Sequence, residues 1–468
     1  MTIKEAISAK LSTNMAISHL DISDSTGKHI NHANFDGGFH LNAVIVSNDF
    51  ENLEILKGID FTNLNDEGLK KLLVEKFSKN INKEIIPGES YIPVSGKVID
   101  EEDVLWGIES MMDAWLTAGR FSIKLERELA RYFGSRFSFL VNSGSSANLL
   151  AFYALTSPKL LDKAIKPGDE IITPSFTYIA TTEVIALLGL TPVFVEVDSE
   201  TFCMDPSALE RAITPKTKAI VPVHLYGQAA HMEEILKIAE AHKLFVIEDN
   251  AQAIGCDYYF SNGNVAKTGT MGHIGCTSFF PSKNLGCFGD GGAMMTNDDE
   301  LASKLRMIAN HGQSKRYYHD QVGCNSRLDS VQAAVLRIKL QHLDSYNEAR
   351  QELASFYDHA FQGIPNVIVP CRKKYSTHVY HQYTLQVMPD VRNRLHDYLA
   401  EREIPSMIYY PIPAHRQQMF SAFGCASLEL PVTDYLTERV ISLPMHTEMK
   451  NDQRDFIVST VQSFFNQL

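Results

Sequence analysis

The chain has 468 residues, of which 44% are hydrophobic and 21% charged, and its formal net charge is −13 at pH 7. This composition is that of a folded protein, and the length allows roughly two to four domains. The acidic balance argues against a nucleic-acid partner, because the 43 basic residues form no runs. The sequence contains no long uninterrupted apolar stretch and no signal-peptide core near its start, so we expect no membrane insertion and a cytoplasmic protein.

The seven cysteines are scattered and lack CxxC spacing. This distribution is typical of reduced thiols in a cytosolic protein, and we predict no metal site from it.

Residues 1–82 are predicted to form a separate small α+β domain. Helical patterns at residues 3–11 and 65–77 flank strand-like runs at residues 18–23 and 40–47. A linker is expected at residues 80–89, where Pro and Gly interrupt any regular element.

The order of these elements resembles the BolA family, and so does the placement of His29, His32 and His40. The resemblance implies an interaction module with a protein partner. BolA proteins carry a metal-ligand histidine further along the chain, but the corresponding place here reads Gly58-Ile59-Asp60. We therefore interpret the three histidines as surface or turn residues rather than ligands.

From residue 83 onward, strands and helices alternate, which predicts an α/β fold with a mainly parallel sheet. Strands are expected at residues 192–197, 219–223 and 244–247, and helices at 101–116, 182–188, 206–212 and 232–242. A long helix beginning near Asp344 opens a segment that mixes strands and helices. We predict a large domain at residues 83–342 and a small α+β C-terminal domain at residues 343–468.

Lys283 lies between an apolar run and a glycine-rich exit. Enclosure by Phe279, Phe280, Pro281, Leu285 and Phe288 would desolvate its amine, lower its pKa and make it a nucleophile towards carbonyl groups. An ordinary surface lysine is the alternative. The four glycines between residues 286 and 292 favour the first interpretation, because they allow the backbone to approach a ligand closely.

Asp249 ends a second apolar run, at residues 243–249, that is predicted to be a buried parallel strand. Ligands in open α/β sheets bind beyond the carboxyl ends of strands. A lysine that forms a Schiff base, together with a strand-end carboxylate that keeps a pyridine nitrogen protonated, is the equipment for pyridoxal 5'-phosphate chemistry.

A phosphate site is predicted at Gly144, Ser145 and Ser146, which precede a helix expected at residues 147–155. Plain N-capping is the alternative. Beyond the strand expected near residue 170, Tyr178 is a candidate for stacking on a flat ring, whereas Phe176 is expected in the core.

These segments resemble the DegT/DnrJ/EryC1/StrS sugar aminotransferase family over roughly residues 90–466. The resemblance rests on Glu248-Asp249-x-Ala-Gln252 and Ser278-Phe-Phe-Pro-Ser-Lys283, and on further motifs at residues 225–228, 311–313 and 323–329. It implies the fold type I (aspartate aminotransferase-like) of pyridoxal phosphate-dependent transferases. It further implies Lys283 and Asp249 as catalytic residues, and cofactor contacts from Gly144, Ser145, Ser146, Tyr178, Gln252, Ser278 and Asn325.

In this family the residue matching Asn325 reaches the cofactor phosphate of the neighbouring subunit, which implies a homodimer with shared active sites. For Gln252, a position on a helix surface is the alternative. Arg327, Tyr410, His319 and Arg316 are candidates for binding the carboxylate or diphosphate of a substrate.

The segment from Tyr409 to Gln417 resembles the substrate-lining turn of aminotransferases that act on 3-oxo sugar nucleotides, above all UDP-2-acetamido-2-deoxy-3-oxo-glucuronate aminotransferases. The resemblance implies a ping-pong transfer of an amino group from glutamate to a keto sugar nucleotide. Surface polysaccharide or lipopolysaccharide biosynthesis would use such a product.

Two alternatives stay open. A stretch near residues 90–165 resembles the CDP-hexulose 3-dehydrase branch of the family, whose members carry a histidine in place of the Schiff-base lysine and a cysteine cluster for an iron–sulfur centre. Here Lys283 is present, and only Cys324 lies in the corresponding region. A regulatory protein that uses the BolA-like unit to bind a partner is the second alternative.

Overall fold

The computed structural model describes residues 17–24, 41–47, 85–157, 160 and 163–468, together with single positions between residues 68 and 77. The chain divides into two compact units, Met1–Lys83 and Glu84–Leu468. Within the described residues no helix is both long and apolar enough to cross a bilayer.

In the first unit, β1 (Ile17–Asp24) and β2 (Leu41–Ser47) form an antiparallel pair in which Asp24 lies opposite Leu41. This confirms the strands predicted at residues 18–23 and 40–47. The predicted helix at residues 3–11 lies outside the described residues, and so do His29, His32, His40 and Gly58-Ile59-Asp60. The resemblance to the BolA family thus stays a prediction.

The second unit is built on a seven-stranded sheet, whose strand order is β3-β11-β10-β7-β6-β4-β5. The strands are β3 (Phe137–Val141), β4 (Glu170–Pro174), β5 (Thr191–Val195), β6 (Thr217–Ile220), β7 (Phe245–Asp249), β10 (Ile274–Ser278) and β11 (Gly292–Thr296). Only β11 runs antiparallel to its neighbours; β10, β7, β6, β4 and β5 pair in parallel. The predicted α/β class with a mainly parallel sheet is confirmed.

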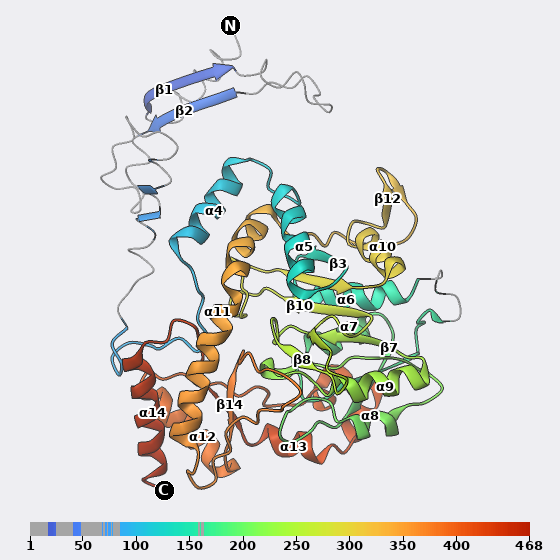
Figure 1. Cartoon of the computed structure of the whole chain (residues 1–468), viewed down its shortest axis with the longest axis vertical. Coiled ribbons are helices and arrows are strands. Elements are labelled where there is room, and N and C mark those ends of the chain that lie inside the picture. Colours follow the sequence, from blue (N-terminus) through green and yellow to red (C-terminus); the bar gives the residue numbers. More distant parts are fainter. Residues whose placement is uncertain are drawn as a thin grey trace. The chain divides into compact units, whose positions relative to one another are not determined.

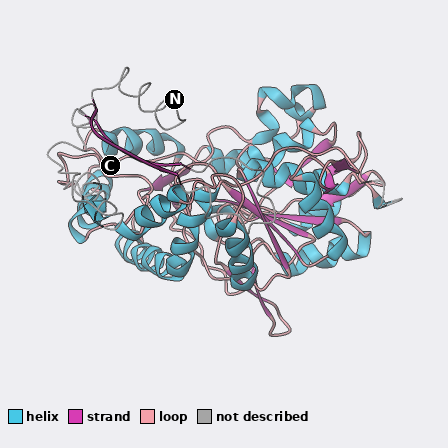
Figure 2. Ribbon diagram, turned by 90° about the horizontal axis from the view of Figure 1, so that it is seen from above, coloured by secondary structure: helices cyan, strands magenta, loops and turns pink. Residues whose placement is uncertain are grey.

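Helices cover both faces of this sheet, as Figure 2 shows from above. They are α5 (Arg120–Phe133), α6 (Gly144–Leu155), α7 (Ala180–Leu187), α8 (Pro206–Ala212), α9 (Met232–His242) and α10 (Asp299–Ile308), whereas α4 (Glu101–Met112) packs on the long helix α11 (Ser330–Phe361). The bounds predicted for residues 206–212 and 232–242 are those of α8 and α9. Helix α6 packs on β10 and β11, and its Leu150 and Phe152 are fully buried with Val141 and Ile247 of the sheet.

The long helix α11 (Ser330–Phe361) begins fourteen residues before Asp344, so the predicted start was wrong. Polar residues between 341 and 348 hid the continuity of the pattern, yet Tyr346 and Asn347 are buried. The helix runs along the body of the unit in Figure 1, and it crosses the predicted domain boundary at residues 342/343. That boundary stays a prediction.

The C-terminal part has its own hydrophobic cluster. It contains β14 (Tyr383–Gln386), α12 (Pro389–Ala400), α13 (Pro431–Thr437), β15 (Val440–Leu443) and α14 (Asn451–Phe465). Tyr357, Leu395 and Ile457 pack there, and so does Ile92, which the predicted boundaries place in the large domain. Ile92 is tied to this part because its backbone N–H donates to the carbonyl of Glu403 at 3.1 Å.

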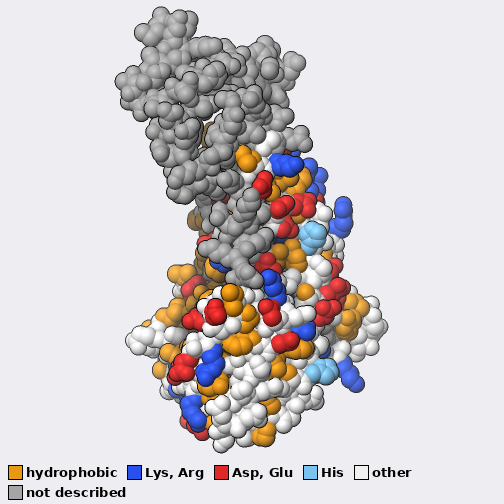
Figure 3. Space-filling model, turned by 90° about the vertical axis from the view of Figure 1, so that its left-hand side faces the viewer, with side chains coloured by type: hydrophobic (Ala, Val, Ile, Leu, Met, Phe, Trp, Pro, Cys, Tyr) orange, Lys and Arg blue, Asp and Glu red, His pale blue; other side chains and the backbone are white. Residues whose placement is uncertain are grey.

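Two short hairpins complete the unit: β8 (Asp257–Tyr259) with β9 (Val265–Lys267), and β12 (Gln313–Lys315) with β13 (Tyr318–His319). The second projects beside α10 in Figure 1. On the face in Figure 3, basic and acidic side chains of the described residues are interspersed.

Candidate active site

Four strands of the sheet bring candidate site residues to one edge. Gly144 follows β3, Tyr178 follows β4, Asp249 ends β7 and Ser278 ends β10. Because these strands run in the same direction, their carboxyl ends meet, and a cavity of about 560 Å³ opens there. It is lined by Ser143, Gly144, Ser145, Asn148, Thr177, Tyr178, Ala180, Thr181, Val223, Asp249, Ala251, Gln252, Ser278, Phe280, Ser282, Lys283, Asp290, His381, Gln382, Met407, Ile408, Tyr409 and Tyr410.

Lys283 reaches this cavity from the turn after β10, where its backbone N–H donates to the carbonyl of Phe280 at 2.8 Å. The turn is tight, because a Cβ at Gly286 would lie 2.4 Å from the carbonyl oxygen of Pro281. Burial lowers the pKa of Lys283 to about 8, although the charge of Asp249 opposes this shift. About a tenth of the amine is therefore neutral and nucleophilic at pH 7, far more than for an ordinary lysine.

Asp249 is nearly completely buried, and both of its oxygens accept hydrogen bonds. The Thr181 hydroxyl donates to Oδ2 at 2.7 Å, Asn148 Nδ2 donates to Oδ2 at 3.2 Å, and the Ala251 N–H donates to Oδ1 at 3.0 Å. These donors stabilise a negative charge that burial alone would disfavour.

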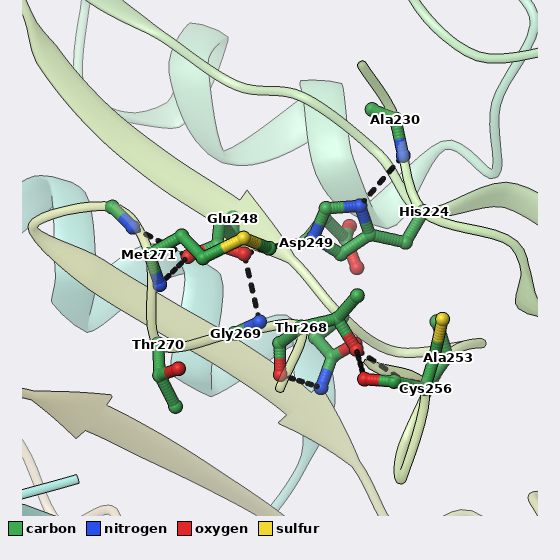
Figure 4. Close-up of polar contacts among 12 residues, drawn as sticks. His224, Ala230, Glu248, Asp249, Ala253, Cys256, Thr268, Gly269, Thr270 and Met271 are labelled. Atoms are coloured by element: carbon green, nitrogen blue, oxygen red, sulfur yellow. Dashed lines mark hydrogen bonds and ion pairs between the residues drawn. The ribbon is translucent and has the colours of Figure 1, made fainter. Parts of the chain in front are cut away.

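The residue before it, Glu248, points to the other side of β7, where its carboxylate bonds to neighbouring segments and holds the strand in place. Figure 4 shows its carboxylate between His224 and the loop that leads into β10. His224 lies 2.9 Å from Glu248 Oε2, and the N–H groups of Gly269, Met271 and Gly272 donate to the carboxylate at 2.5–2.7 Å. The backbone N–H of His224 donates to the backbone carbonyl of Asp249 at 3.1 Å. This buried network therefore fixes the backbone that carries the Asp249 side chain.

His381 lies beside Lys283 in the cavity. Its Nε2 lies 3.4 Å from Lys283 Nζ, and its Nδ1 is buried without a partner among the described residues. Burial, followed by the charges of Lys283 and Arg350, holds the pKa of His381 well below its usual value, so a neutral imidazole faces the amine.

The start of α6 has the features of an anion site. Ser143 caps the helix, since its Oγ accepts from the Ser146 N–H at 3.0 Å, and Gly144 and Ser145 therefore begin the first turn. A Cβ at Gly144 would lie only 2.7 Å from the Cβ of Ser278, so glycine lets the two segments meet. The first-turn N–H groups of α6 and the hydroxyls of Ser145 and Ser278 suit a phosphate, and the Ser278 Oγ also accepts from the Phe280 N–H at 3.3 Å.

The opposite wall is aromatic. Tyr178 is 58% exposed, and its ring lies 6.1 Å from that of Tyr410, whereas Phe176 is buried in the core as predicted. Gln252 is buried, and its Nε2 donates to the Tyr410 hydroxyl at 3.0 Å. The alternative of a helix-surface glutamine was wrong, because Gln252 lies in a turn after β7 and faces the cavity.

Four other predicted site residues lie away from the cavity within the same chain. Asn325, Arg316 and His319 are exposed, and Arg327 Nη1 donates to Asn310 Oδ1 at 2.7 Å. Arg316 and Arg327 line a separate groove of about 540 Å³ beside α10 and the β12–β13 hairpin.

Sequence reasoning missed Ser143, Asn148, Thr181 and His381. Ser143 carried a signal, since Ser three residues before a second Ser at a helix start is typical of an N-cap. The other three come from helix interiors or loops far along the chain, and only the fold brings them to Asp249 or Lys283. In the described parts of the chain, no group of three or more His, Cys, Asp or Glu side chains is arranged to hold a metal ion.

The arrangement fits pyridoxal 5'-phosphate: a buried amine with lowered pKa, a carboxylate opposite it, a helix N-terminus for the phosphate and an exposed tyrosine ring at the wall. Most of the residues predicted to hold the cofactor line this cavity, whereas Ser146 is hydrogen-bonded to Ser143 and does not line it, and Asn325 lies away from it.

The chain is similar in sequence to several proteins over most of its length. The chain is 42% identical over 359 residues to a "Pleiotropic regulatory protein" of Geobacillus stearothermophilus, which covers 76% of this chain and 92% of that protein. It is 42% identical over 323 residues to the UDP-2-acetamido-2-deoxy-3-oxo-D-glucuronate aminotransferase of Pseudomonas aeruginosa, covering 69% of this chain and 85% of that enzyme.

Two solved structures are similar as well. That of Streptomyces venezuelae DesV in complex with a ketimine intermediate superposes with a TM-score of 0.72 at 37% identity, over 78% of this chain and 95% of that one. That of Bacillus subtilis NtdA with bound cofactor PMP superposes with a TM-score of 0.72 at 29% identity, over 82% and 87%.

The family model of the DegT/DnrJ/EryC1/StrS aminotransferases matches residues 98–462, which include every residue of the cavity. Pyridoxal phosphate is the cofactor, and the fold is that of the pyridoxal phosphate-dependent aminotransferases. The chain belongs to the DegT/DnrJ/EryC1/StrS aminotransferase family.

Proposed function

We propose that this aminotransferase moves an amino group from glutamate to a 3-oxo sugar nucleotide, with Lys283 and Asp249 as its catalytic residues. The observation that carries the proposal is the cavity at the carboxyl edge of the sheet, which Lys283, Asp249 and the start of α6 line together. The names of the relatives that act on UDP-linked and dTDP-linked sugars support a nucleotide sugar as substrate.

Bound pyridoxal phosphate supplies a ring that accepts the electron pair released when a proton leaves the amino-bearing carbon. Lys283 would hold the cofactor through Nζ, and the same atom, whose pKa burial lowers to about 8, would carry that proton. Asp249 would keep the ring nitrogen protonated. Ser145, Ser278 and the first-turn amides of α6 would bind the phosphate, and Tyr178 would stack on the ring.

The substrate side of the cavity needs cations that this part of the chain does not supply. Among the described residues that line the cavity, Lys283 is the only lysine or arginine. A nucleotide diphosphate or a sugar carboxylate calls for Arg-type donors. We assign them to a second copy of the chain, whose Arg316, His319 and Arg327 would complete the substrate side of each site in a homodimer. Asn325 of that copy would reach the cofactor phosphate, while Tyr410 is supplied by the same chain as Lys283.

We also propose that the product enters surface polysaccharide biosynthesis in the cytoplasm. Residues 1–82 would bind a protein partner rather than take part in the chemistry. A purely regulatory role for the whole chain has no need of an amine with lowered pKa in the same cavity as a buried carboxylate.

The test is mass spectrometry of products after incubation with glutamate and a panel of 3-oxo and 4-oxo nucleotide sugars, with Lys283→Ala as the control. We expect an amine at carbon 3 and stoichiometric 2-oxoglutarate. Amination of 4-oxo sugars alone would overturn the position. Loss of water without amination would favour the dehydrase alternative.

A further inference from the structure

Two buried side chains beside Asp249 have no role in the function proposed so far. Thr181 is 1% exposed and Asn148 is 3% exposed. Both donate to the same oxygen, Oδ2 of Asp249, at 2.7 Å and 3.2 Å, while the other oxygen accepts from the Ala251 N–H at 3.0 Å.

The three donors come from three different elements. Asn148 lies in the second turn of α6, Thr181 in the first turn of α7, and Ala251 in the turn after β7. The two helix starts thus flank the strand end that carries Asp249. A carboxylate held from three directions cannot rotate about its side-chain torsions without losing at least one hydrogen bond.

The orientation of the Asn148 amide follows from its neighbours. Its Nδ2 lies between Asp249 Oδ2 and the carbonyl oxygen of Ala180, which is 3.5 Å away. The reversed amide would place Oδ1 against two acceptors. The group that faces the carboxylate is therefore a donor.

A carboxylate as buried as Asp249 keeps its charge only if donors compensate for the lost water. Thr181 and Asn148 supply that compensation at one oxygen, and they also decide how the carboxylate is turned relative to the cavity. Neither residue type is required for packing at these positions, since valine and leucine have similar volumes and would leave the core filled.

We propose that Thr181 and Asn148 are positioning residues that hold the Asp249 carboxylate charged and oriented towards the ring nitrogen of bound pyridoxal phosphate. This inference rests on the proposed role of Asp249. By this inference, three side chains together keep the proton on the ring nitrogen: Asp249, Thr181 and Asn148.

The test compares Thr181→Val, Asn148→Leu and the double variant as holoenzymes loaded with pyridoxal phosphate that carries ¹⁵N in the ring. The ¹⁵N chemical shift reports the proton on that nitrogen directly and does not depend on turnover. In the double variant we expect the signal to move towards the unprotonated pyridine position. We expect kcat to fall by at least about tenfold, the loss typical of one hydrogen bond to a charged group, with KM changed far less.

Two matched controls separate positioning from folding. Thr181→Ser keeps the hydroxyl and should restore the wild-type nitrogen signal. Thr182→Val removes the neighbouring buried hydroxyl, which donates to the carbonyl of Ile179 at 3.0 Å and does not contact Asp249, so its signal should match wild type.

An unchanged nitrogen signal in the folded double variant would overturn the inference, whatever happens to kcat. An equal shift in Thr182→Val would overturn it too, because the effect would then come from helix α7 as a whole. Failure of the proposed function looks different. In that case borohydride reduction of the wild-type enzyme would not fix the cofactor on Lys283.

Discussion

The cavity at the carboxyl edge of the sheet and the segment from Gln313 to Arg327 differ in how much the chain itself determines them. In the cavity, Asp249 and Gln252 are buried and hydrogen-bonded, and their partners come from the same chain. In the segment, Arg316 and Asn325 are exposed, and the hairpin within it projects from the body in Figure 1.

The difference indicates that the cofactor site and the substrate site are built from different parts of the chain. One chain brings together the amine, the carboxylate and the helix start for the phosphate, so we expect both catalytic residues of a site to come from one subunit, with Asn325 of a second copy adding one contact to the phosphate. The cations for an anionic substrate lie on the exposed segment and can serve only a site to which that segment docks. The predictions below test each half of this comparison.

The largest effect is expected for Lys283→Ala. Removing the amine eliminates both the attachment point and the proton carrier, so kcat should fall by at least about 10³-fold, within the range of general acid–base catalysis. Borohydride followed by peptide mass spectrometry should label Lys283 in the wild type and nothing in the variant. Lys237→Ala, at an exposed lysine paired with Glu233, is the control. Label on a different lysine would contradict the assignment.

Asp249→Asn should lower kcat by about 10²-fold while raising the Kd for pyridoxal phosphate much less, because its charge matters most when the ring accepts electrons. Isothermal titration calorimetry measures the Kd for pyridoxal phosphate, and steady-state kinetics measure kcat. Asp290→Asn, at a more exposed carboxylate that lines the same cavity, serves as the control. Equal losses of affinity and rate in Asp249→Asn would show that the residue only binds.

The lowered pKa of Lys283 predicts a difference in reactivity from exposed lysines. With a pKa of about 8 instead of the 10.5 that is usual for lysine, its neutral fraction near pH 7 exceeds that of an ordinary lysine by on the order of 10²-fold. Competitive acetylation of the apoenzyme, with Lys237 as internal reference, measures this. Reactivity of Lys283 should rise with pH, reach half of its maximum near pH 8, the pKa of this amine, and then level off. A plateau reached only above pH 10 would contradict a desolvated amine.

Asn325 tests the other half of the comparison. If its amide donates to a phosphate across a subunit interface, Asn325→Ala should weaken cofactor retention by roughly tenfold or more, the value of one charge-assisted hydrogen bond.

Mixed subunits give the sharper experiment. Lys283→Ala and Asn325→Asp chains are each inactive, but a heterodimer has one site built from unmutated contributions only. Random exchange should restore about a quarter of wild-type activity, as two-fold symmetry requires. No recovery, in mixtures that native mass spectrometry shows to contain heterodimers, would mean that each site is built within one chain.

How much of the fold could be predicted depended on local signals. Helices α8 and α9 have Pro206 at a helix start and a clear apolar periodicity, and their predicted bounds agree with the structure. The start of α11 was missed because His342, Asp344 and Asn347 read as a polar break. Asn347 is buried because it bonds Asn284 and the Ile254 carbonyl, contacts that no local pattern reveals.

The site follows the same rule. Lys283, Asp249 and Gly144 were predicted because strand ends and glycine turns have signatures in the sequence, and the structure brings all three to one cavity. Thr181, Asn148 and His381 were not predicted. They reach the site from separate elements, and their role depends on distances of 2.7–3.4 Å that only the folded chain defines.

The smallest effect is expected for deletion of residues 1–82. The compact unit Glu84–Leu468 contains every residue of the cavity, and the family model begins only at residue 98. A unit with its own hydrophobic core can fold alone, so the truncated enzyme should keep kcat and KM within about threefold and the same absorbance of bound cofactor. Kinetics and the melting temperature of the truncated enzyme, compared with full-length protein, check this. A loss of activity in a truncated enzyme that still binds cofactor and melts normally would show that residues 1–82 reach the substrate, and the chemistry would then not be confined to the second unit.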